Sequence, residues 1–217
     1  MWIFIRDNLA PIAFLAMLII VLMIIQKGYV VLDKYFLYFP SDELTLTPVD
    51  VGLMYENVYL TTADGVELPG WFIPGETETV LILCHGNAGN ISDRLDYLDL
   101  MHTHLGVSIF IFDDRGYGLS QGSPSESGLY LDAEAAVEFI RDKVGSEEGP
   151  QNLLLFGRSL GSALALKMAS KHVVDGVILE APFTSTMALA KTHYPYVPEF
   201  LVKLFIGARY ESDTVAG

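Results

Sequence analysis

From Thr79 onward, short apolar runs alternate with segments whose apolar residues recur at helical spacing. The runs that predict buried strands are Val80–Cys84, Ser108–Phe112, Leu153–Phe156 and Gly176–Leu179. The segments that predict helices are Asp93–Leu105, Gly128–Ile140 and Ser159–Lys171. Strands and helices that alternate at this spacing predict an α/β fold, with a mostly parallel sheet covered by helices on both faces.

Two extended runs upstream of this alternation predict an antiparallel hairpin. Val58–Thr61 and Val66–Ile73 flank Ala63-Asp64-Gly65, a turn signal whose glycine can take a positive φ. We expect this hairpin at an edge of the sheet, within a core that spans residues 51–183. Residues 29–50 contain two prolines and show no clear period, so we expect a linker that lies over the domain.

The N-terminal region holds an apolar stretch of a different kind. Asn8–Gln26 is a run of 19 residues without a charge, long enough as a helix to span a bilayer. We therefore expect a transmembrane anchor within residues 1–28. A cleaved secretory signal fits less well, because only Arg6 precedes the run and no small-residue cleavage site follows it. A buried core helix also fits less well, because a helix that is apolar on every face needs a larger protein around it. Basic residues on the two sides of the run are too evenly balanced to orient the anchor.

Charge narrows the choice of partners. The chain carries a net charge of −14, and residues 1–34 sum to +1, so the remainder carries −15. This balance argues against nucleic-acid binding and against attraction of the domain surface to anionic lipid. Cys84 is the only cysteine, which rules out an intrachain disulfide and a thiolate metal site. With no ligand cluster or phosphate-binding loop in the sequence, we expect no metal or organic cofactor.

The pentapeptide Gly157-Arg158-Ser159-Leu160-Gly161 lies between a predicted strand and a predicted helix. A serine on such a sharp turn has a strained backbone, so the residues two positions away must be small, and Gly157 and Gly161 are. The turn presents the Ser159 hydroxyl above the sheet edge, which predicts a nucleophile. The helix starts there, so the Leu160 N–H points to where an oxyanion would form. A chance pentapeptide is the competing interpretation, and the flanking strand and helix patterns argue against it.

Two further loops with unusual residues follow predicted strands, and all three loops would gather at the carboxyl end of the sheet. They are His85-Gly86-Asn87-Ala88-Gly89-Asn90 and Asp113-Asp114-Arg115-Gly116-Tyr117-Gly118. In the first loop, the His85-Gly86 pair lets the backbone turn so that the Asn87 N–H faces the serine as a second oxyanion donor. We interpret His85 as a loop imidazole bonded to backbone rather than a catalytic base, and Arg115 as a structural clamp.

Along the chain, the His85 loop comes first, the Asp113 loop second and the Ser159 pentapeptide third, each after a predicted strand. These three loops, in this order, resemble those of the α/β-hydrolase superfamily. More narrowly, the chain is similar to membrane-anchored α/β-hydrolase domain-containing proteins, close to the serine aminopeptidase and monoacylglycerol lipase branch. The resemblance covers about residues 29–186. It implies the α/β-hydrolase fold, with Ser159 at the position of the family nucleophile. It also places Asn87 and Leu160 at the positions whose backbone amides form the oxyanion hole.

The acid and the histidine of a catalytic triad cannot be carried over from this resemblance. In this fold both follow the serine on loops after later strands, yet only 58 residues follow Ser159 and one further strand is predicted among them. Glu180 at the end of that strand and His193 downstream are the candidates for acid and base. Residues 184–217, which include Tyr194-Pro195-Tyr196-Val197-Pro198, are expected to form a lid or cap over the site. We therefore expect a sheet that is incomplete at the C-terminus.

Two functions from different classes follow from these features. The first is a serine hydrolase that cleaves an ester, thioester or amide bond through an acyl-enzyme on Ser159, with the sequence a fragment of a longer chain. The second is a non-catalytic, truncated, membrane-tethered protein that binds a ligand without turnover. A strand edge left uncovered where the chain stops at Gly217 favours the first. Dehalogenation would need an aspartate in place of Ser159. The apolar lid and the anchor favour a small-molecule or lipid-like acyl substrate, and the oligomeric state is left open.

Overall fold

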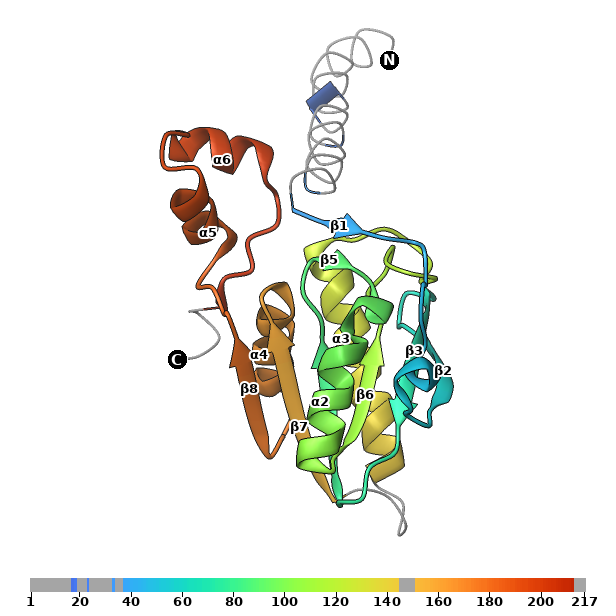
Figure 1. Ribbon diagram of the computed structural model, residues 1–217. Helices are drawn as coiled ribbons and strands as arrows, with labels where there is room; N and C mark the ends of the chain where they lie inside the picture. The colour runs from blue at the N-terminus through green and yellow to red at the C-terminus, as the bar shows by residue number, and fades with distance from the viewer. Residues whose placement is uncertain (1–16, 19–22, 24–32, 34–36, 145–150, 213–217) are drawn as a thin grey trace, which may run out of the picture.

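The computed structural model describes residues 17, 18, 23, 33, 37–144 and 151–212. A six-stranded sheet in the order β2-β3-β6-β4-β7-β8 lies at the centre of this described part (Figure 1). The strands are β2 (Glu56–Thr61), β3 (Glu67–Ile73), β4 (Thr79–Cys84), β6 (Ser108–Phe112), β7 (Asn152–Arg158) and β8 (Gly176–Glu180). The predicted α/β fold is confirmed.

β2 and β3 form the predicted antiparallel hairpin. Leu60 pairs with Leu68 across it, and Gly65 in the turn takes a φ of 82°, a conformation that glycine adopts without strain. The Thr62 hydroxyl braces the turn, because it accepts from the Val66 N–H at 3.0 Å. β3 also pairs antiparallel with β6, which joins the hairpin to the rest of the sheet.

The remaining strands run parallel, as predicted. Ile82 at the centre of β4 pairs with Phe110 of β6 on one side and with Leu155 of β7 on the other. β8 pairs parallel with β7, with Phe156 opposite Ile178. The loops that leave β4, β6 and β7 therefore meet at one edge of the sheet, although their residues are far apart in the sequence.

Helices cover both faces of the sheet. They are α2 (Leu95–Leu105), preceded by the 3-10 helix η2 (Ile91–Arg94), and α3 (Glu126–Val144) and α4 (Leu160–Lys171). In β6, Ile109 and Ile111 pack in the core shared with α2, whereas Phe110 and Phe112 pack in the core shared with α3 and α4. Successive side chains of a strand point to opposite faces, so a strand covered on both faces is apolar at every position.

The segment before β2 packs onto the carboxyl edge of the sheet. Here β1 (Phe39–Pro40) pairs in parallel with β5 (Ala88–Gly89) in the loop after β4, and the 3-10 helix η1 (Pro48–Val51) follows. The Tyr38 side chain is 1% exposed, and its hydroxyl lies 2.7 Å from the Tyr210 hydroxyl. Part of the segment predicted as a linker is therefore built into the core.

After β8 the chain forms a cap, residues 186–208, that stands beyond the end of the sheet where β7 and β8 finish (Figure 1). Its helices are α5 (Thr186–His193) and α6 (Glu199–Phe205). Two backbone hydrogen bonds close its base, from the Thr186 N–H to Arg209 O at 2.9 Å and from the Ser212 N–H to Thr184 O at 2.8 Å. The region expected to form a lid is a closed helical excursion from the core.

The predicted anchor Asn8–Gln26 lies almost entirely outside the described residues, which include only Met17, Leu18 and Met23 of it. Among the helices in the described part of the chain, none combines the length and the apolarity needed to cross a bilayer. The anchor stays a prediction.

Candidate active site

Ser159 occupies a sharp turn between β7 and α4. Its φ of 50° and ψ of −113° belong to neither helix nor strand, and such strain in a non-glycine residue persists only where the surroundings enforce it. Two backbone hydrogen bonds do so. The Ser159 N–H donates to Glu180 O at 2.9 Å, and Ser159 O accepts from the Ser162 N–H at 3.0 Å. The strand, turn and helix predicted around the pentapeptide are confirmed.

The two glycines of the pentapeptide let backbone segments approach closely around this turn. A Cβ on Gly161 would lie 2.0 Å from Cys84 O, and a Cβ on Gly157 would lie 2.4 Å from Gly161 O. Both clashes are with backbone atoms, which cannot swing aside as a flexible side chain can. The contact between the start of α4 and the end of β4 therefore depends on glycine at position 161.

The loop after β4 lies beside the serine. Cys84 pairs with Gly157 across the sheet, so both strands end at the same level. A Cβ on Gly86 would lie 3.7 Å from Ser159 Cβ and 3.6 Å from Arg158 O, which is ordinary van der Waals contact. The sheet thus brings together the first loop and the elbow, as the sequence predicted.

Hydrogen bonds fix Asn87 while leaving its N–H unused. Asn87 Nδ2 donates to Leu37 O at 2.8 Å, and the Asn87 carbonyl accepts from the Phe39 N–H at 3.0 Å and from the Tyr117 hydroxyl at 2.9 Å. Within the residues the structure describes, the Asn87 N–H donates to no protein acceptor. The Leu160 N–H is the first amide of α4 and has no partner inside the helix. Both amides predicted as oxyanion donors are therefore available.

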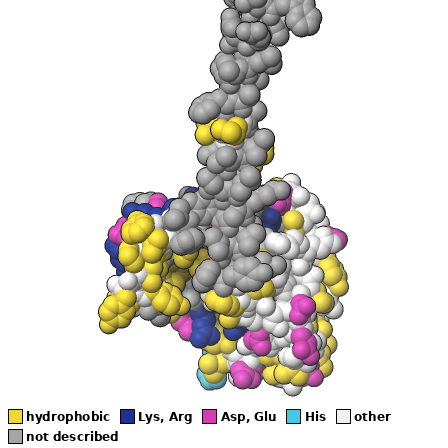
Figure 2. Space-filling view, turned by 90° about the horizontal axis from the view of Figure 1, so that it is seen from above, with side chains coloured by type: hydrophobic (Ala, Val, Ile, Leu, Met, Phe, Trp, Pro, Cys, Tyr) yellow, Lys and Arg dark blue, Asp and Glu magenta, His cyan; other side chains and the backbone are white. Residues whose placement is uncertain are grey.

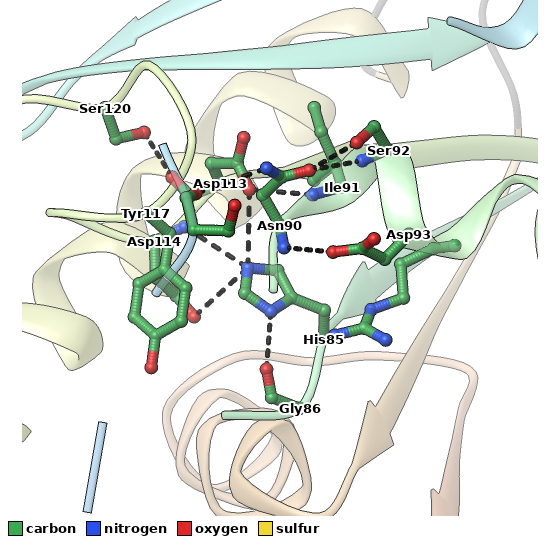
Figure 3. A network of polar contacts seen from close by, with 12 residues as sticks. His85, Gly86, Asn90, Ile91, Ser92, Asp93, Asp113, Asp114, Tyr117 and Ser120 are labelled. Carbon is green, nitrogen blue, oxygen red and sulfur yellow. Dashed lines mark hydrogen bonds and ion pairs between the residues drawn. The ribbon is translucent and has the colours of Figure 1, made fainter. Parts of the chain in front are cut away.

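His85 orients the peptide that carries the Asn87 N–H (Figure 3). His85 Nδ1–H donates to Gly86 O at 2.7 Å. In a trans peptide the C=O and the N–H point in opposite directions, so this bond turns the Asn87 N–H away from the imidazole. His85 Nε2 accepts from the Asp114 N–H at 3.5 Å, which favours the tautomer with the proton on Nδ1. His85 is thus bonded to backbone on both sides, as interpreted from the sequence.

Burial keeps the His85 ring neutral. The residue is 1% exposed, and burial lowers its pKa to about 4. His85 Nε2 lies 3.8 Å from a carboxyl oxygen of Asp113 and 3.8 Å from one of Asp114, but an uncharged ring forms no ion pair with them at neutral pH. A ring whose two nitrogens already serve the backbone is a support for the loop rather than a base for the serine.

Asp113 and Asp114 form a buried acidic pair behind the loop (Figure 3). Asp113 Oδ1 accepts from the Ile91 N–H at 2.9 Å, whereas Asp113 Oδ2 and Asp114 Oδ1 are buried without a hydrogen-bond partner among the described residues. Burial raises the pKa of Asp113 to about 7 and that of Asp114 well above its usual range. The sequence placed both in the second loop but carried no sign of their burial. In the described part of the chain, no group of three or more His, Cys, Asp or Glu side chains could hold a metal ion.

Arg115 clamps three parts of the fold together, as interpreted from the sequence. Its Nη1 and Nη2 donate to the two carboxylate oxygens of Asp64 in the hairpin turn, at 2.7 and 2.9 Å. Its Nε and its backbone N–H both donate to Asp132 on α3 at 2.9 Å. Asp132 is fully buried, so a negative charge on it is unfavourable unless the Arg115 guanidinium pairs with it. The clamp ties the second loop to the hairpin turn and to α3.

Glu180 is engaged by Arg158 and Tyr97 rather than by a histidine of the described region. Arg158 Nε lies 3.2 Å from Glu180 Oε1, and the Tyr97 hydroxyl donates to Glu180 Oε2 at 2.7 Å. Burial is the larger cause and this hydrogen bond the second, and together they raise the pKa of Tyr97 to about 12. His193 is the last residue of α5, and its side chain lies outside what the structure describes. Glu180 thus contacts the pentapeptide twice, through its carbonyl to the Ser159 N–H and through its carboxylate to Arg158.

Two carboxylates that the sequence analysis did not single out hold the returning arm of the cap. Asp33 accepts from the N–H groups of residues 207–208 at 2.9 and 3.0 Å. Glu126 at the start of α3 accepts from the N–H groups of residues 209–210 at 2.6 and 2.9 Å. Burial raises the pKa of Asp33, although the two amides oppose the shift. We call these two side chains the carboxylate clasp. No local sequence pattern marks pairs so distant in the chain.

Comparison with known proteins places these features in a family. A family model described as serine aminopeptidase, S33, matches residues 75–214. This range contains the loop after β4, the elbow and the cap.

Relatives in other organisms share most of this chain. The Saccharomyces cerevisiae protein named uncharacterized membrane protein YNL320W is 43% identical over 158 residues, covering 71% of this chain and 55% of the relative. The Arabidopsis thaliana α/β-hydrolase domain-containing protein WAV2 is 33% identical over 166 residues, covering 74% of this chain and 53% of the relative. The chain therefore spans about half the length of these relatives.

Solved structures share the fold. The Pyrococcus furiosus esterase Pf2001 matches with a TM-score of 0.61 at 25% identity, covering 77% of this chain and 66% of that one. An α/β hydrolase from Vibrio vulnificus matches with a TM-score of 0.63 at 25% identity, covering 77% of this chain and 60% of that one. Together with the family match and the two relatives, the fold shows that this chain belongs to the serine aminopeptidase (S33) family of α/β hydrolases.

Proposed function

We propose that the protein is a serine hydrolase that cleaves an ester, thioester or amide bond through an acyl-enzyme on Ser159. The observation that carries the proposal is the strained φ of 50° at Ser159, on an elbow beside a loop whose Asn87 N–H is unused. Strain of this kind at a strand-to-helix turn presents the hydroxyl for attack.

In the proposed reaction, Ser159 Oγ attacks the carbonyl carbon of the substrate while a base accepts the hydroxyl proton. The carbonyl oxygen becomes an oxyanion that accepts hydrogen bonds from the Asn87 and Leu160 amides. The bond to the leaving group then breaks, and the leaving alcohol, thiol or amine takes the proton from the base. Water attacks the acyl-enzyme by the same route, releasing the acid and restoring Ser159.

His193 is our candidate for the base, because it follows the serine in the chain as the fold requires. Glu180, the acid candidate from the sequence, is the weaker of the two candidates, because Arg158 and Tyr97 already contact its carboxylate. Its carbonyl does bond the Ser159 N–H, so Glu180 supports the elbow as well.

We propose a small-molecule or lipid-like acyl substrate. The support is the cap, whose helices stand at the carboxyl edge of the sheet where the elbow lies. Apolar caps suit acyl chains. The similar structure from Pyrococcus furiosus is that of an esterase, which supports ester chemistry on this fold.

We also propose that Asn8–Gln26 anchors the protein in a membrane as a single-pass helix. The support is the 19-residue run without a charge, together with the name of the yeast relative, which calls that protein a membrane protein.

Labelling with a fluorophosphonate probe tests the nucleophile, because the probe forms a covalent bond with an activated serine. We expect the wild type to be labelled, Ser159→Ala to be unlabelled, and Ser170→Ala, which removes an exposed serine from the same helix, to be labelled like the wild type. Labelling that survives Ser159→Ala would contradict the proposal. Absence of labelling in all three folded proteins would instead support a protein that binds without turnover.

Hydrolysis of p-nitrophenyl butyrate by the same proteins then tests the base. We expect turnover by the wild type to fall sharply in His193→Ala and to change less in Glu180→Gln. A wild-type rate equal to that of Ser159→Ala, despite Ser159-dependent labelling, would mean that His193 does not serve as the base.

A further inference from the structure

The tip of the cap exposes a cluster of large hydrophobic side chains. The exposed fractions are 66% for Tyr194, 96% for Tyr196, 43% for Val197 and 66% for Phe200. All four lie within seven consecutive residues, at the turn from α5 into α6. We call this group the cap tip. Exposed apolar residues that stand singly are normal on a protein surface, whereas a contiguous cluster of this kind marks a contact surface.

These side chains are not needed to hold the cap together. Ala190 of α5 and Val202 of α6 are buried, at 9% and 8% exposure, so the inner faces of the two helices are filled by other residues. Seen from the cap end, the lobe formed by the cap carries hydrophobic side chains on its outer surface (Figure 2). The outward-facing aromatic residues are therefore available to a partner.

The cap is held at its base in a defined position. The two backbone hydrogen bonds at its base and the carboxylate clasp of Asp33 and Glu126 fix the returning arm at residues 207–210. The tip is thus presented from a fixed base, at the end of the sheet where the loops of the candidate active site meet.

The clasp also links the cap to the N-terminal apolar run. Asp33, which bonds residues 207–208, lies seven residues after Gln26, the last residue of the uncharged run. Seven residues of fully extended chain reach at most about 25 Å. A bilayer that receives Asn8–Gln26 would therefore have its surface within about 25 Å of the returning arm of the cap.

We propose that the cap tip inserts its aromatic side chains into the surface of the bilayer that the N-terminal run enters. Tyrosine suits this position because its ring is apolar and its hydroxyl can stay hydrated among the headgroups. The inference rests on the proposed anchor and adds to it a second membrane contact, made by the domain itself.

The charges around the tip select the kind of lipid. Lys191 and Lys203 both pair with Glu199, at 2.9 and 2.7 Å, so this one carboxylate offsets one of the two positive charges and the two cap helices keep a charge of only +1. The net charge of −14 opposes attraction to anionic lipid. The contact is therefore an apolar one, made with zwitterionic lipid such as phosphatidylcholine.

Site-specific fluorescence tests this contact in the 217-residue chain. Cys84, the only native cysteine, is buried, so a cysteine placed at the tip can be labelled selectively with an environment-sensitive nitrobenzoxadiazole dye. The test variant is Tyr196→Cys. The matched control is Val173→Cys, because Val173 is 87% exposed and follows α4 at the opposite end of the sheet. Both are reconstituted into phosphatidylcholine vesicles that carry a doxyl quencher at a shallow acyl position.

We expect the dye at position 196 to shift its emission to the blue and to be quenched by doxyl lipid, and the dye at position 173 to show neither change. Adding Tyr194→Glu and Phe200→Glu to the Tyr196→Cys variant should restore the emission of the dye in water. Equal and weak quenching at both positions would overturn the inference. A blue shift without doxyl quenching would also overturn it, because the tip would then lie against protein, such as a second copy of the chain.

Flotation of the same vesicles after an alkaline wash separates the two membrane proposals. A protein that floats but shows no quenching at position 196 retains the anchor and lacks the cap contact. A protein that does not float lacks the anchor, and the inference is overturned with it. Neither result depends on the reactivity of Ser159, which the fluorophosphonate probe reports separately.

Discussion

The loop after β4 and the cap tip lie at the same end of the sheet but are built in opposite ways. In the loop, His85, the Asn87 side chain and the Asn87 carbonyl are all held by hydrogen bonds, and His85 is 1% exposed. In the tip, Tyr196 is 96% exposed and lies in a short turn between two helices. One region is fixed from within, and the other is left open at the surface.

This difference matches what each region is proposed to do. An oxyanion donor stabilises a transition state only when it is already aimed, because reorienting a dipole during the reaction would cost part of the benefit. A surface that meets lipid needs exposed apolar area and no fixed geometry. Substitutions in the loop and its supports should therefore affect stability and reactivity, whereas substitutions at the tip should affect association alone.

The largest effect is expected where backbone segments meet beneath the loop. Gly161→Ala places a Cβ 2.0 Å from Cys84 O, so we expect a loss of about 4 kcal/mol or more in the free energy of unfolding, measured by urea denaturation. Gly86→Ala is the matched control, because its nearest contacts of 3.6 and 3.7 Å are ordinary. Similar stability of the two variants would show that close packing does not determine the elbow.

A smaller effect, on reactivity, is expected from His85. His85→Leu cannot donate to Gly86 O, so the Asn87 N–H loses its orientation, and we expect fluorophosphonate labelling of Ser159 to slow by about 10- to 100-fold. His85→Asn keeps an N–H donor of similar reach and should recover part of the rate. Equal rates in the two folded variants would show that His85 does not act through the Gly86 carbonyl.

Asp33, one of the two carboxylates of the clasp, should contribute about as much as its two hydrogen bonds to the returning arm of the cap. Asp33→Ala leaves the N–H groups of residues 207–208 without their acceptor, so we expect a loss of about 2 kcal/mol in the free energy of unfolding, measured by urea denaturation. Glu199→Gln on the exposed surface of the cap is the control and should change stability much less than Asp33→Ala, because water screens its ion pairs. An unchanged stability of Asp33→Ala would mean that Asp33 does not help to hold the cap.

The buried acid behind the loop should make stability depend on pH. Burial raises the pKa of folded Asp113 to about 7, above about 3.9 in the unfolded chain, so the folded state keeps a proton that the unfolded state loses between these values. Its stabilising contribution is complete below about pH 4 and is lost as pH rises through about 7. Relative to the wild type, Asp113→Asn should therefore gain more than about 1 kcal/mol between about pH 5 and about pH 8 in thermal or urea unfolding. A difference between the two proteins that stays constant with pH would contradict a raised pKa at this site.

The smallest effect is expected at the tip itself. Tyr196→Ser removes a side chain that is 96% exposed, so the free energy of unfolding should change by less than about 0.5 kcal/mol. The labelling rate of Ser159 in detergent should also stay at the wild-type value. A large loss of stability would mean that Tyr196 packs within the fold, and the contrast between loop and tip would not hold.

The sequence determined those features whose cause is local. Four apolar runs predicted β4, β6, β7 and β8; in the central strands β4 and β6 the cause is that a strand covered on both faces must be apolar at successive positions. Gly65 predicted the hairpin turn, and the glycines at 157 and 161 predicted the elbow, because a turn with positive φ or a close backbone approach leaves room for little else. Neighbouring residues determine each of these features, and so the pattern could be recognised.

Only the tertiary structure decided which distant groups meet. The sequence named His85 as a loop imidazole, but its contacts with Asp113 and Asp114 depend on β4 and β6 lying side by side. It offered Glu180 as a candidate acid, and only packing shows that Arg158 and Tyr97 contact its carboxylate. The clasp of the cap by Asp33 spans more than 170 residues. Hydrophobic periodicity specifies which face of an element is buried, whereas the partner of a buried polar group is set only when separate elements pack together.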